Sequence, residues 1–340
     1  MSKYAFWNNK GGTGKTSLAF QAVTRYSEKY PDKKILAIDL CPQANLTELF
    51  LGGLMGNGSN HLNSLYINNP KRKSVGGYFQ DRLPSPFTVP KINYNDYICM
   101  PNKFNTSINT NIDLLAGDPV VELQTNSIAT LSNTQLPGTN TWIAVIDWIN
   151  DFINLTNNKY DDVFIDTNPS FSIYTQIALA SVEKLILPVM ADDSSRRAIQ
   201  NAFSLIHGVG LPSPIYNKYS FSSSMINANR VLPSVHLIVK NRLTQYMGPA
   251  SAYNSVLVAI NNDLRTLLQS NPNIFTFTNL NNGILEIRDF QTTGVVAFAE
   301  GKPFHKVSTG SHNILGKSTQ ISQQYINKCL KDIDNLVSLL

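Results

Sequence analysis

The sequence predicts an α/β protein: a doubly wound, mostly parallel sheet with helices on both faces. The first observation is the succession of an apolar run at Tyr4–Trp7, a glycine-rich turn at Lys10–Thr16 and helical spacing over Ser17–Lys29. The second is another apolar run, Ile35–Ile38, which completes a strand–helix–strand unit. Units of this kind build parallel sheets that are covered by helices on both faces.

Further elements follow the same two patterns. Short apolar runs predict buried strands, and apolar side chains that recur every three or four residues predict helices. Beyond the first unit, strands are expected at Ile112–Leu115, Val163–Asp166, Leu185–Val189 and Leu237–Val239, and helices at Trp142–Leu155 and Gln320–Leu340.

Two segments interrupt the pattern. Residues 52–110 are rich in Gly, Asn, Ser and Pro, which predicts an irregular insertion with short elements at best. Residues 208–234 form a second loop-like insertion, and no stretch of the chain has the composition of a linker. We therefore expect residues 1–340 to form a single domain that carries both insertions and ends in a helix at about residues 320–340.

The composition excludes several classes of protein. The three cysteines form no CxxC pair, so neither a disulfide framework nor a cysteine-held metal cluster is expected. No run of 18 apolar residues occurs, and the start, MSKYAFWNNK, is too polar for a signal peptide. The reducing cytosol is the expected compartment.

Charge is distributed unevenly along the chain. The formal net charge is +5, and between Arg196 and Lys331 basic residues outnumber acidic ones by 13 to 4. This bias permits contact with a phosphate backbone, and an ordinary solvated surface with a chance imbalance explains it equally well.

The turn Lys10–Thr16 reads KGGTGKT, which is typical of a phosphate-binding loop. Glycines let backbone N–H groups converge on phosphate oxygens, and the N-terminus of the following helix adds partial positive charge. Lys15 can contact the β and γ phosphates, and the Thr16 hydroxyl can bind Mg²⁺. The strict pattern requires glycine where this chain has Asn9, so the loop is a variant with an extra lysine, Lys10, at its front.

Two acids end predicted strands near this loop. Asp39 lies in IDLCPQANLT, and Asp166 lies in DVFIDTNPS. A carboxylate at such a position can hold a metal-bound water or stand in the second shell of Mg²⁺. Each motif alone is weak evidence, because many strands end in Asp and because a capped helix after the strand would explain Asp39 as well.

Taken together, the motifs resemble the ParA/MinD family of deviant P-loop ATPases, and ParA-type partition ATPases most closely. The family's KGGxGKT, DxDPQxNxT and DTxPS motifs have counterparts at Lys10–Thr16, Asp39–Thr47 and Asp166–Ser170. A later strand ending at Asn241 and a Gly-Lys-Pro turn at Gly301–Pro303 follow in the family's order.

The resemblance implies ATP as the nucleotide, Mg²⁺ as its metal and a homodimer that forms when ATP binds. Lys10 would be the signature lysine that reaches the phosphates of the partner subunit, and Asn241 would touch adenine. Catalytic roles would fall to Lys10, Lys15, Asp39 and Asp166. Nucleotide contacts would come from Lys10, Gly11, Gly12, Thr13, Gly14, Lys15, Thr16, Ser17 and Asn241. The metal would be held near Thr16, Asp39 and Asp166.

Two departures from the family pattern matter. The second acid of the DxDPQ motif is Cys41 here, and a thiol is a poor substitute for a carboxylate that positions water. We therefore expect slow ATP hydrolysis, although Cys41 could also be simply a small buried residue. At the adenine loop the family often has Ile-Pro, whereas Thr278–Gly283 contains no proline.

The resemblance also implies a role and partners. No helix-turn-helix precedes the loop, as in the shorter family members. An ATP-bound dimer would hold nonspecific double-stranded DNA, a centromere-binding adaptor on the cargo would trigger release, and the protein would be cytoplasmic and nucleoid-associated. Candidate DNA contacts are Arg265, Arg288, Lys302 and Lys306. Each of them alone is better explained as a solvated surface charge, and together they fit the basic bias of this half of the chain.

Two other functions stay open. A membrane-cycling positioning protein of the MinD type would use the amphipathic 320–340 segment. That segment mixes acids with lysines, so a membrane partner is not expected. A slow-turnover, ATP-sensing regulatory or defence protein would account for Cys41 and for the 52–110 insertion.

Overall fold

The computed structural model describes residues 1–190, 192–243 and 251–340 and confirms the predicted fold class. Eight strands form one sheet in the order β3-β4-β2-β5-β1-β6-β7-β8, and β9 and β10 form a separate hairpin. Neighbours in the large sheet run parallel, except that β3 is antiparallel to β4. The strands are β1 Ser2–Phe6, β2 Ile35–Leu40, β3 Ile98–Cys99, β4 Ile112–Leu115, β5 Asp162–Thr167, β6 Lys184–Val189, β7 Ser234–Leu243, β8 Ile284–Arg288, β9 Gly310–Ile314 and β10 Lys317–Ile321.

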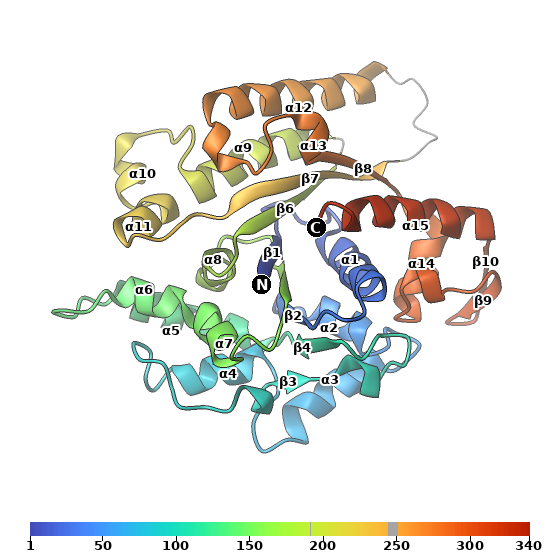
Figure 1. Ribbon diagram of the computed structural model, residues 1–340, viewed down its shortest axis with the longest axis horizontal. Coiled ribbons are helices and arrows are strands. Elements are labelled where there is room, and N and C mark those ends of the chain that lie inside the picture. Colours follow the sequence, from blue (N-terminus) through green and yellow to red (C-terminus); the bar gives the residue numbers. More distant parts are fainter. Residues whose placement is uncertain (191, 244–250) are drawn as a thin grey trace.

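Helices cover both faces of the large sheet (Figure 1). The α-helices are α1 Lys15–Lys29, α2 Asn45–Phe50, α3 Gly58–Ile67, α4 Val75–Arg82, α5 Val120–Asn133, α6 Thr141–Ile146, α7 Trp148–Leu155, α8 Ile173–Ala180, α9 Asp193–His207, α10 Pro214–Lys218, α11 Phe221–Asn227, α12 Ser251–Ser270, α13 Leu280–Gly283, α14 Gln291–Ala299 and α15 Gln323–Val337. Short 3₁₀ turns are η1 Tyr94–Asp96, η2 Pro101–Lys103, η3 Pro272–Ile274 and η4 Phe304–Lys306.

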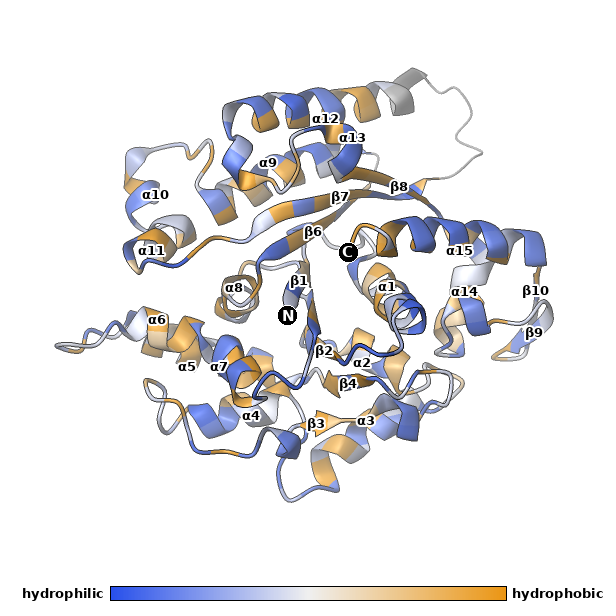
Figure 2. Ribbon diagram, in the orientation of Figure 1, coloured by the Kyte–Doolittle hydropathy of each residue, from blue (hydrophilic) through white to orange (hydrophobic). Residues whose placement is uncertain are grey.

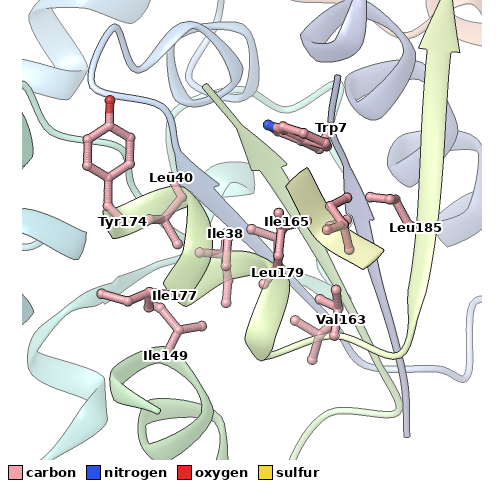
Figure 3. Packing of buried hydrophobic residues seen from close by; sticks show 14 of the residues in the cluster. Trp7, Ile38, Leu40, Ile149, Val163, Ile165, Tyr174, Ile177, Leu179 and Leu185 are labelled. Carbon is pink, nitrogen blue, oxygen red and sulfur yellow. The ribbon is translucent and has the colours of Figure 1, made fainter. Parts of the chain in front are cut away.

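The two faces have separate apolar cores, as the alternation of side chains along each strand requires. Tyr4 and Phe6 of β1 pack on one side with α1, α14 and α15, whereas Ala5 lies in the core on the other side. Figure 3 shows that other core, where Ile38 and Ile165 of the sheet face Ile177 of α8. Because both faces are buried, the central strands are nearly continuous apolar runs, and this is why the sequence marks them clearly.

Three predicted boundaries differ from the structure. The segment Trp142–Leu155 forms two helices, α6 and α7, which meet at Asp147. Residues 52–110 are more ordered than expected, because α3 and α4 bury apolar side chains and the Ser74 hydroxyl caps α4 by accepting from Gly77 N. Residues 208–234 likewise hold the short helices α10 and α11.

The C-terminal helix packs on the sheet. The expected helix at residues 320–340 is α15, which begins three residues later because β10 extends to Ile321. Its apolar face contacts α1, β8 and η4, and Ile326, Cys329 and Ile333 are fully buried there. The face that a membrane-cycling protein would insert is therefore already covered. Among the described residues, no helix is long and apolar enough to cross a membrane.

Candidate nucleotide site

The phosphate loop leaves the carboxyl end of β1 and enters α1, at the edge of the sheet where ligands of doubly wound folds bind. Gly12 and Gly14 have φ values of +75° and +80°, a conformation that side chains with a Cβ rarely adopt. A Cβ on Gly14 would also stand 2.3 Å from Nδ2 of Asn241. The Thr13 hydroxyl is buried without a hydrogen-bond partner among the described residues. The loop thus keeps free polar groups beside a close-packed backbone.

Lys15 lies inside this loop. Its ammonium donates to the carbonyls of Asn8 and Lys10, both at 3.1 Å. Burial lowers the pKa of Lys15, and the negative charge of Asp166 partly opposes that shift. A desolvated ammonium held only by carbonyls gains strongly from a phosphate that reaches it.

Asp166 ends β5 beside the loop. One carboxylate oxygen accepts a 2.7 Å hydrogen bond from Thr16 Oγ1, and the other, Oδ1, is buried with no partner among the described residues. Burial, and secondly the nearby Asp39, raise the pKa of Asp166 to about 7. A hydroxyl next to an unsatisfied carboxylate oxygen is the hard-oxygen donor set that suits Mg²⁺, so the residues present fit this ion.

Asp39 lies directly opposite Asp166 across the β2–β5 pair, and its environment is different. Its Oδ2 accepts from both the N–H and the hydroxyl of Thr47, and its Oδ1 accepts from the N–H of Cys41. Burial raises the pKa of Asp39 to about 6 against these hydrogen bonds. Asp39 therefore ties the start of α2 to the sheet, and both of its oxygens are engaged.

Cys41 stands next to these acids, and 6% of its surface is exposed. Burial raises the pKa of the Cys41 thiol to about 12, and the charges of Asp39 and Asp166 act in the same direction. The thiol is therefore neutral at physiological pH and cannot accept a proton from water as a carboxylate could.

The side chain of Lys10, the first residue of the phosphate loop, reaches to the start of α9 in this structure. Its ammonium contacts the two oxygens of Asp192 at 2.7 and 2.6 Å and Ser195 Oγ at 3.2 Å. Asp192 also caps α9 by accepting from Ser195 N. Although burial opposes the shift, the hydrogen bonds from Lys10 and the α9 cap lower the pKa of Asp192 to about 2. Asp192 was not identified from the sequence. Its signal in the sequence is weak: an acid that follows the strand ending in Pro188–Val189 and precedes Ser195 by three residues.

Asn241 lies at the phosphate loop, as the motif order suggested. Its side chain is buried, and Nδ2 donates a 2.9 Å hydrogen bond to the carbonyl of Thr13. The next residue, Arg242, has a positive φ of +59°. Its Nε also lies near Gly14, 3.8 Å from where a Cβ on that glycine would stand. Asn241 thus positions the loop backbone, and its contact with adenine stays a prediction. Gly11 lies within the same loop, and Ser17 follows it in the first turn of α1.

Arg288 and Lys302, two of the four DNA candidates, are paired with acids in this structure. Arg288 forms hydrogen bonds of 2.7 and 3.1 Å with the two oxygens of Asp332. The Lys302 ammonium lies 2.7 Å from a Glu300 carboxylate oxygen. Both charges are therefore compensated within the chain.

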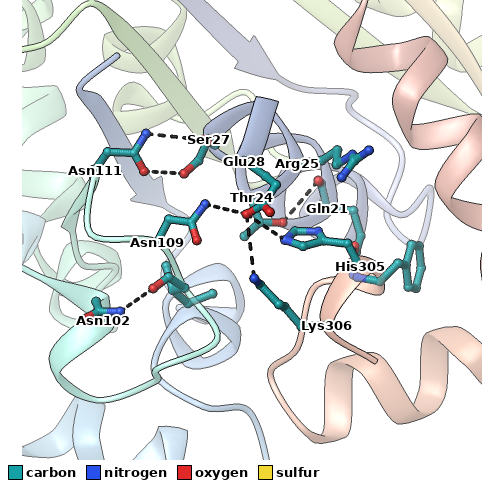
Figure 4. Close-up of polar contacts among 12 residues, drawn as sticks. Gln21, Thr24, Arg25, Ser27, Glu28, Asn102, Asn109, Asn111, His305 and Lys306 are labelled. Atoms are coloured by element: carbon teal, nitrogen blue, oxygen red, sulfur yellow. Dashed lines mark hydrogen bonds and ion pairs between the residues drawn. The ribbon is translucent and has the colours of Figure 1, made fainter. Parts of the chain in front are cut away.

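Lys306 and Arg265, the other two DNA candidates, are more open to a ligand. Lys306 lies 3.8 Å from Glu28 in a polar cluster that joins α1 to η4 (Figure 4). Arg265 on α12 is exposed and donates to Asn262. The four basic residues lie on α12, on β8 and in the segment that follows α14.

Comparisons with known proteins identify a family and a shared fold. Residues 1–211 match the family AAA_31, which is described as an AAA domain. No curated protein sequence shows significant similarity to the chain.

Several solved structures share the fold. A McdA variant from Cyanothece in complex with ATP is 13% identical, with a TM-score of 0.63 over 100% of this chain and 96% of that one. A plasmid partition protein described as putative, from Borrelia burgdorferi and bound to AMPPNP, is 15% identical, with a TM-score of 0.55 over 100% and 99%. Cobyrinic acid a,c-diamide synthase from Mycobacterium smegmatis, with ADP and magnesium, is 13% identical, with a TM-score of 0.53 over 88% and 91%.

These likenesses confirm the predicted P-loop fold. Because the family match spans more than half of the 340 residues, the chain belongs to the AAA_31 family, which is described as an AAA domain.

Proposed function

We propose that this protein is an ATP-dependent partition or positioning ATPase whose ATP-bound dimer holds nonspecific double-stranded DNA. The observation that carries the proposal is the convergence of three features at one edge of the sheet. They are the glycine loop, the buried ammonium of Lys15, and the unpartnered oxygen of Asp166 beside Thr16. ATP and Mg²⁺ would give hydrogen-bond or charge partners to the N–H groups of the loop, to the Lys15 ammonium and to the free oxygen of Asp166.

The loop residues have distinct tasks in this proposal. The N–H groups of Gly11, Gly12, Thr13 and Gly14 cradle the phosphates, and Lys15 leaves its two carbonyl partners for the β and γ phosphates. The ATP magnesium ion would supply charge neutralisation on the transferring phosphate.

Four further residues complete this site. Thr16 and Asp166 hold the metal and its water, Ser17 contributes at the start of α1, and Asn241 contacts the base as well as the loop.

Lys10 connects nucleotide binding to dimerisation. In this structure its ammonium is held by Asp192, so it must leave that carboxylate before it can reach the phosphates of a partner subunit. Two anionic partners thus compete for one lysine, and the phosphate charge biases the exchange toward the dimer.

Hydrolysis is expected to be slow. Cys41 replaces the acid that positions water, and both oxygens of Asp39 are engaged by Thr47 and Cys41. The remaining carboxylate with a free oxygen, Asp166, lies beside the metal-binding hydroxyl of Thr16. We therefore expect a long-lived ATP-bound dimer, whose release from DNA would be triggered by an adaptor protein bound to the cargo.

The DNA surface would comprise Arg265, Arg288, Lys302 and Lys306, and the protein would be nucleoid-associated in the cytoplasm. Phosphate contacts of this kind are blind to sequence and weaken steeply with salt. Arg288 and Lys302 each lie 2.7 Å from an acid, whereas Lys306 lies 3.8 Å from Glu28 and Arg265 donates to the neutral Asn262. We therefore expect Arg265 and Lys306 to contribute more.

The test is binding to a random-sequence duplex without nucleotide, with ADP and with ATP, at low and moderate salt. The proposal predicts binding that requires ATP, weakens with salt and falls about tenfold in the double variant Arg265→Ala/Lys306→Ala. Lys317→Ala, in the β9–β10 hairpin, is the matched control. Absence of DNA binding in all nucleotide states would remove the DNA part of the proposal.

The neutral thiol of Cys41 also favours a second function, an ATP-sensing regulator with very little turnover. This alternative predicts that purified protein retains ATP through many hours of dialysis and recruits a protein partner other than a centromere binder. Rapid loss of bound ATP as ADP and phosphate would count against it.

A further inference from the structure

The insertion at residues 208–234 exposes an unusual amount of apolar surface. Ile215, Tyr216 and Tyr219 on and beside α10 are 63%, 57% and 74% exposed. Ile226 of α11 is 62% exposed, and Val231, in the segment that leads into β7, is 86% exposed. In Figure 2 hydrophobic colours appear along α11 and along that segment.

This exposure does not reflect a loosely attached segment. Phe221 and Met225 of α11 are buried, and the Phe221 ring lies 5.8 Å from that of Phe171 and 6.0 Å from that of Trp142. One side of α11 is thus anchored in the core while Ile226 faces solvent. A surface helix normally presents polar side chains on its outer face, so an apolar outer face indicates a further contact.

The same face has very little charge. Of the 27 residues from 208 to 234, only Lys218 and Arg230 are charged, and Arg230 forms an ion pair with Asp147. Residues 134–146, which include the half-exposed Leu136 and reach α11 through Trp142, contain no charged residue. Charged residues make up 15% of the whole chain, so two charges in these residues are a depletion even against this low average.

We infer that this face, formed by residues 134–142 and 208–233, binds a second copy of the chain in a two-fold symmetric contact that does not require ATP. In such a contact each patch meets its own copy, so any net charge on it would repel itself. A protein of net charge +5 can therefore self-associate best through the surface from which charge is missing.

Other occupants fit the face less well. DNA and anionic lipid both require clustered basic residues, and Lys218 is the single charge here without an ion pair among the described residues. This face has exposed apolar side chains, Ser and Asn around them, and few charges. That composition is typical of the centre of a protein–protein interface. The phosphate loop contributes no residue to this face, so the contact does not depend on ATP.

The test is sedimentation of nucleotide-free protein over a range of concentrations. We expect a reversible monomer–dimer equilibrium that moderate salt leaves unchanged, and a dissociation constant raised about tenfold by Tyr219→Asp. Ile67→Asp, at a residue that is 76% exposed on α3, is the matched control and should leave the equilibrium unchanged. A mixture of Tyr219→Asp and Tyr219→Lys proteins should associate more tightly than either variant alone, because opposite charges then face each other.

Two outcomes would overturn the inference. One is wild-type protein that remains monomeric without nucleotide at every concentration tested. The other is a dimer that Tyr219→Asp and Ile67→Asp affect equally. ATP binding, measured on the same variants, should match wild type, so a failure here is distinguishable from a failure of the proposed ATPase function.

Discussion

The phosphate loop and the 208–233 face depart from ordinary protein architecture in opposite ways. At the loop, polar groups are buried without partners: the Thr13 hydroxyl and one oxygen of Asp166 make no hydrogen bond to any residue that the structure describes. On the 208–233 face, apolar side chains such as Tyr219 and Val231 stand in water. Both arrangements cost free energy in the isolated chain. The comparison teaches that each kind of departure indicates its missing partner, a polar ligand in one place and an apolar surface in the other.

The largest expected effect is loss of ATP binding in Lys15→Ala. Lys15 is the buried cation of the loop, so its removal should weaken ATP binding by about two orders of magnitude or more. Titration with a fluorescent ATP analogue measures this change, and Lys317→Ala serves as the exposed control. Lys15→Ala also removes the cost of burying the Lys15 charge, so the midpoint of denaturant unfolding should not fall. ATP affinity within twofold of wild type would mean that the loop is not the ATP site.

The second prediction concerns the missing acid. Cys41→Asp restores a carboxylate beside Asp39 and Asp166, and we expect ATP turnover to rise about tenfold or more. Cys41→Ala is the control, since it alters the same position without supplying a base. Steady-state phosphate release is the measurement, with Mg²⁺ present to offset the added negative charge. An unchanged rate in Cys41→Asp would show that another group already positions the water.

The sequence and the structure agree best where chemistry restricts residue choice. Gly14 is favoured as glycine because its φ of +80° strains a residue with a Cβ. Thr16 and Asp166 meet because their elements end at the same edge of the sheet. The central strands β1, β2, β4, β5, β6 and β7 were equally predictable, since burial on both faces demands apolar runs. Strands β3 and β8 and the β9–β10 hairpin were not predicted. Such constraints can be recognised in a single sequence.

Other features depend on long-range contacts and could not be predicted. The hydrogen bonds between Lys10 and Asp192 join residues that are 182 positions apart. α3 and α4 are short helices among glycines and prolines, so their periodicity is too brief to distinguish them from loop. The exposure of Tyr219 depends on which side of the insertion packs inward, and composition alone does not indicate that.

The third prediction sharpens the role of Lys10. Asp192→Asn keeps a good helix cap on α9 but removes the charge that holds the Lys10 ammonium. We expect ATP to bind about three- to tenfold more tightly and the ATP-dependent dimer to form at lower protein concentration. Asp193→Asn is the matched control, because Asp193 is the residue after Asp192, is exposed and forms an ion pair with Arg197 instead of Lys10. Equal ATP affinities for the two variants would show that the Asp192 contact does not restrain Lys10.

The smallest expected effect concerns His305, a buried polar group outside both regions. Its Nδ1 has no hydrogen-bond partner among the described residues, and its Nε2 lies 3.5 Å from Glu28 (Figure 4). Burial lowers the pKa of His305 from 6.5 to about 4, although the negative charge of Glu28 opposes the shift. Between these two values the unfolded chain binds a proton that the folded chain does not, so stability must fall as pH decreases through this range.

The variant His305→Gln should reduce that dependence. The loss attributable to the imidazole is at most about 3 kcal/mol between about pH 6.5 and pH 4, so at about pH 5 we expect roughly 1–2 kcal/mol. Denaturant unfolding of both proteins at about pH 7.5 and about pH 5 gives the comparison. A wild-type protein that loses no more stability than His305→Gln would mean that the folded chain accommodates the proton, with Glu28 as its partner. Unlike the loop and the 208–233 face, this site would then satisfy its polar group from within the chain.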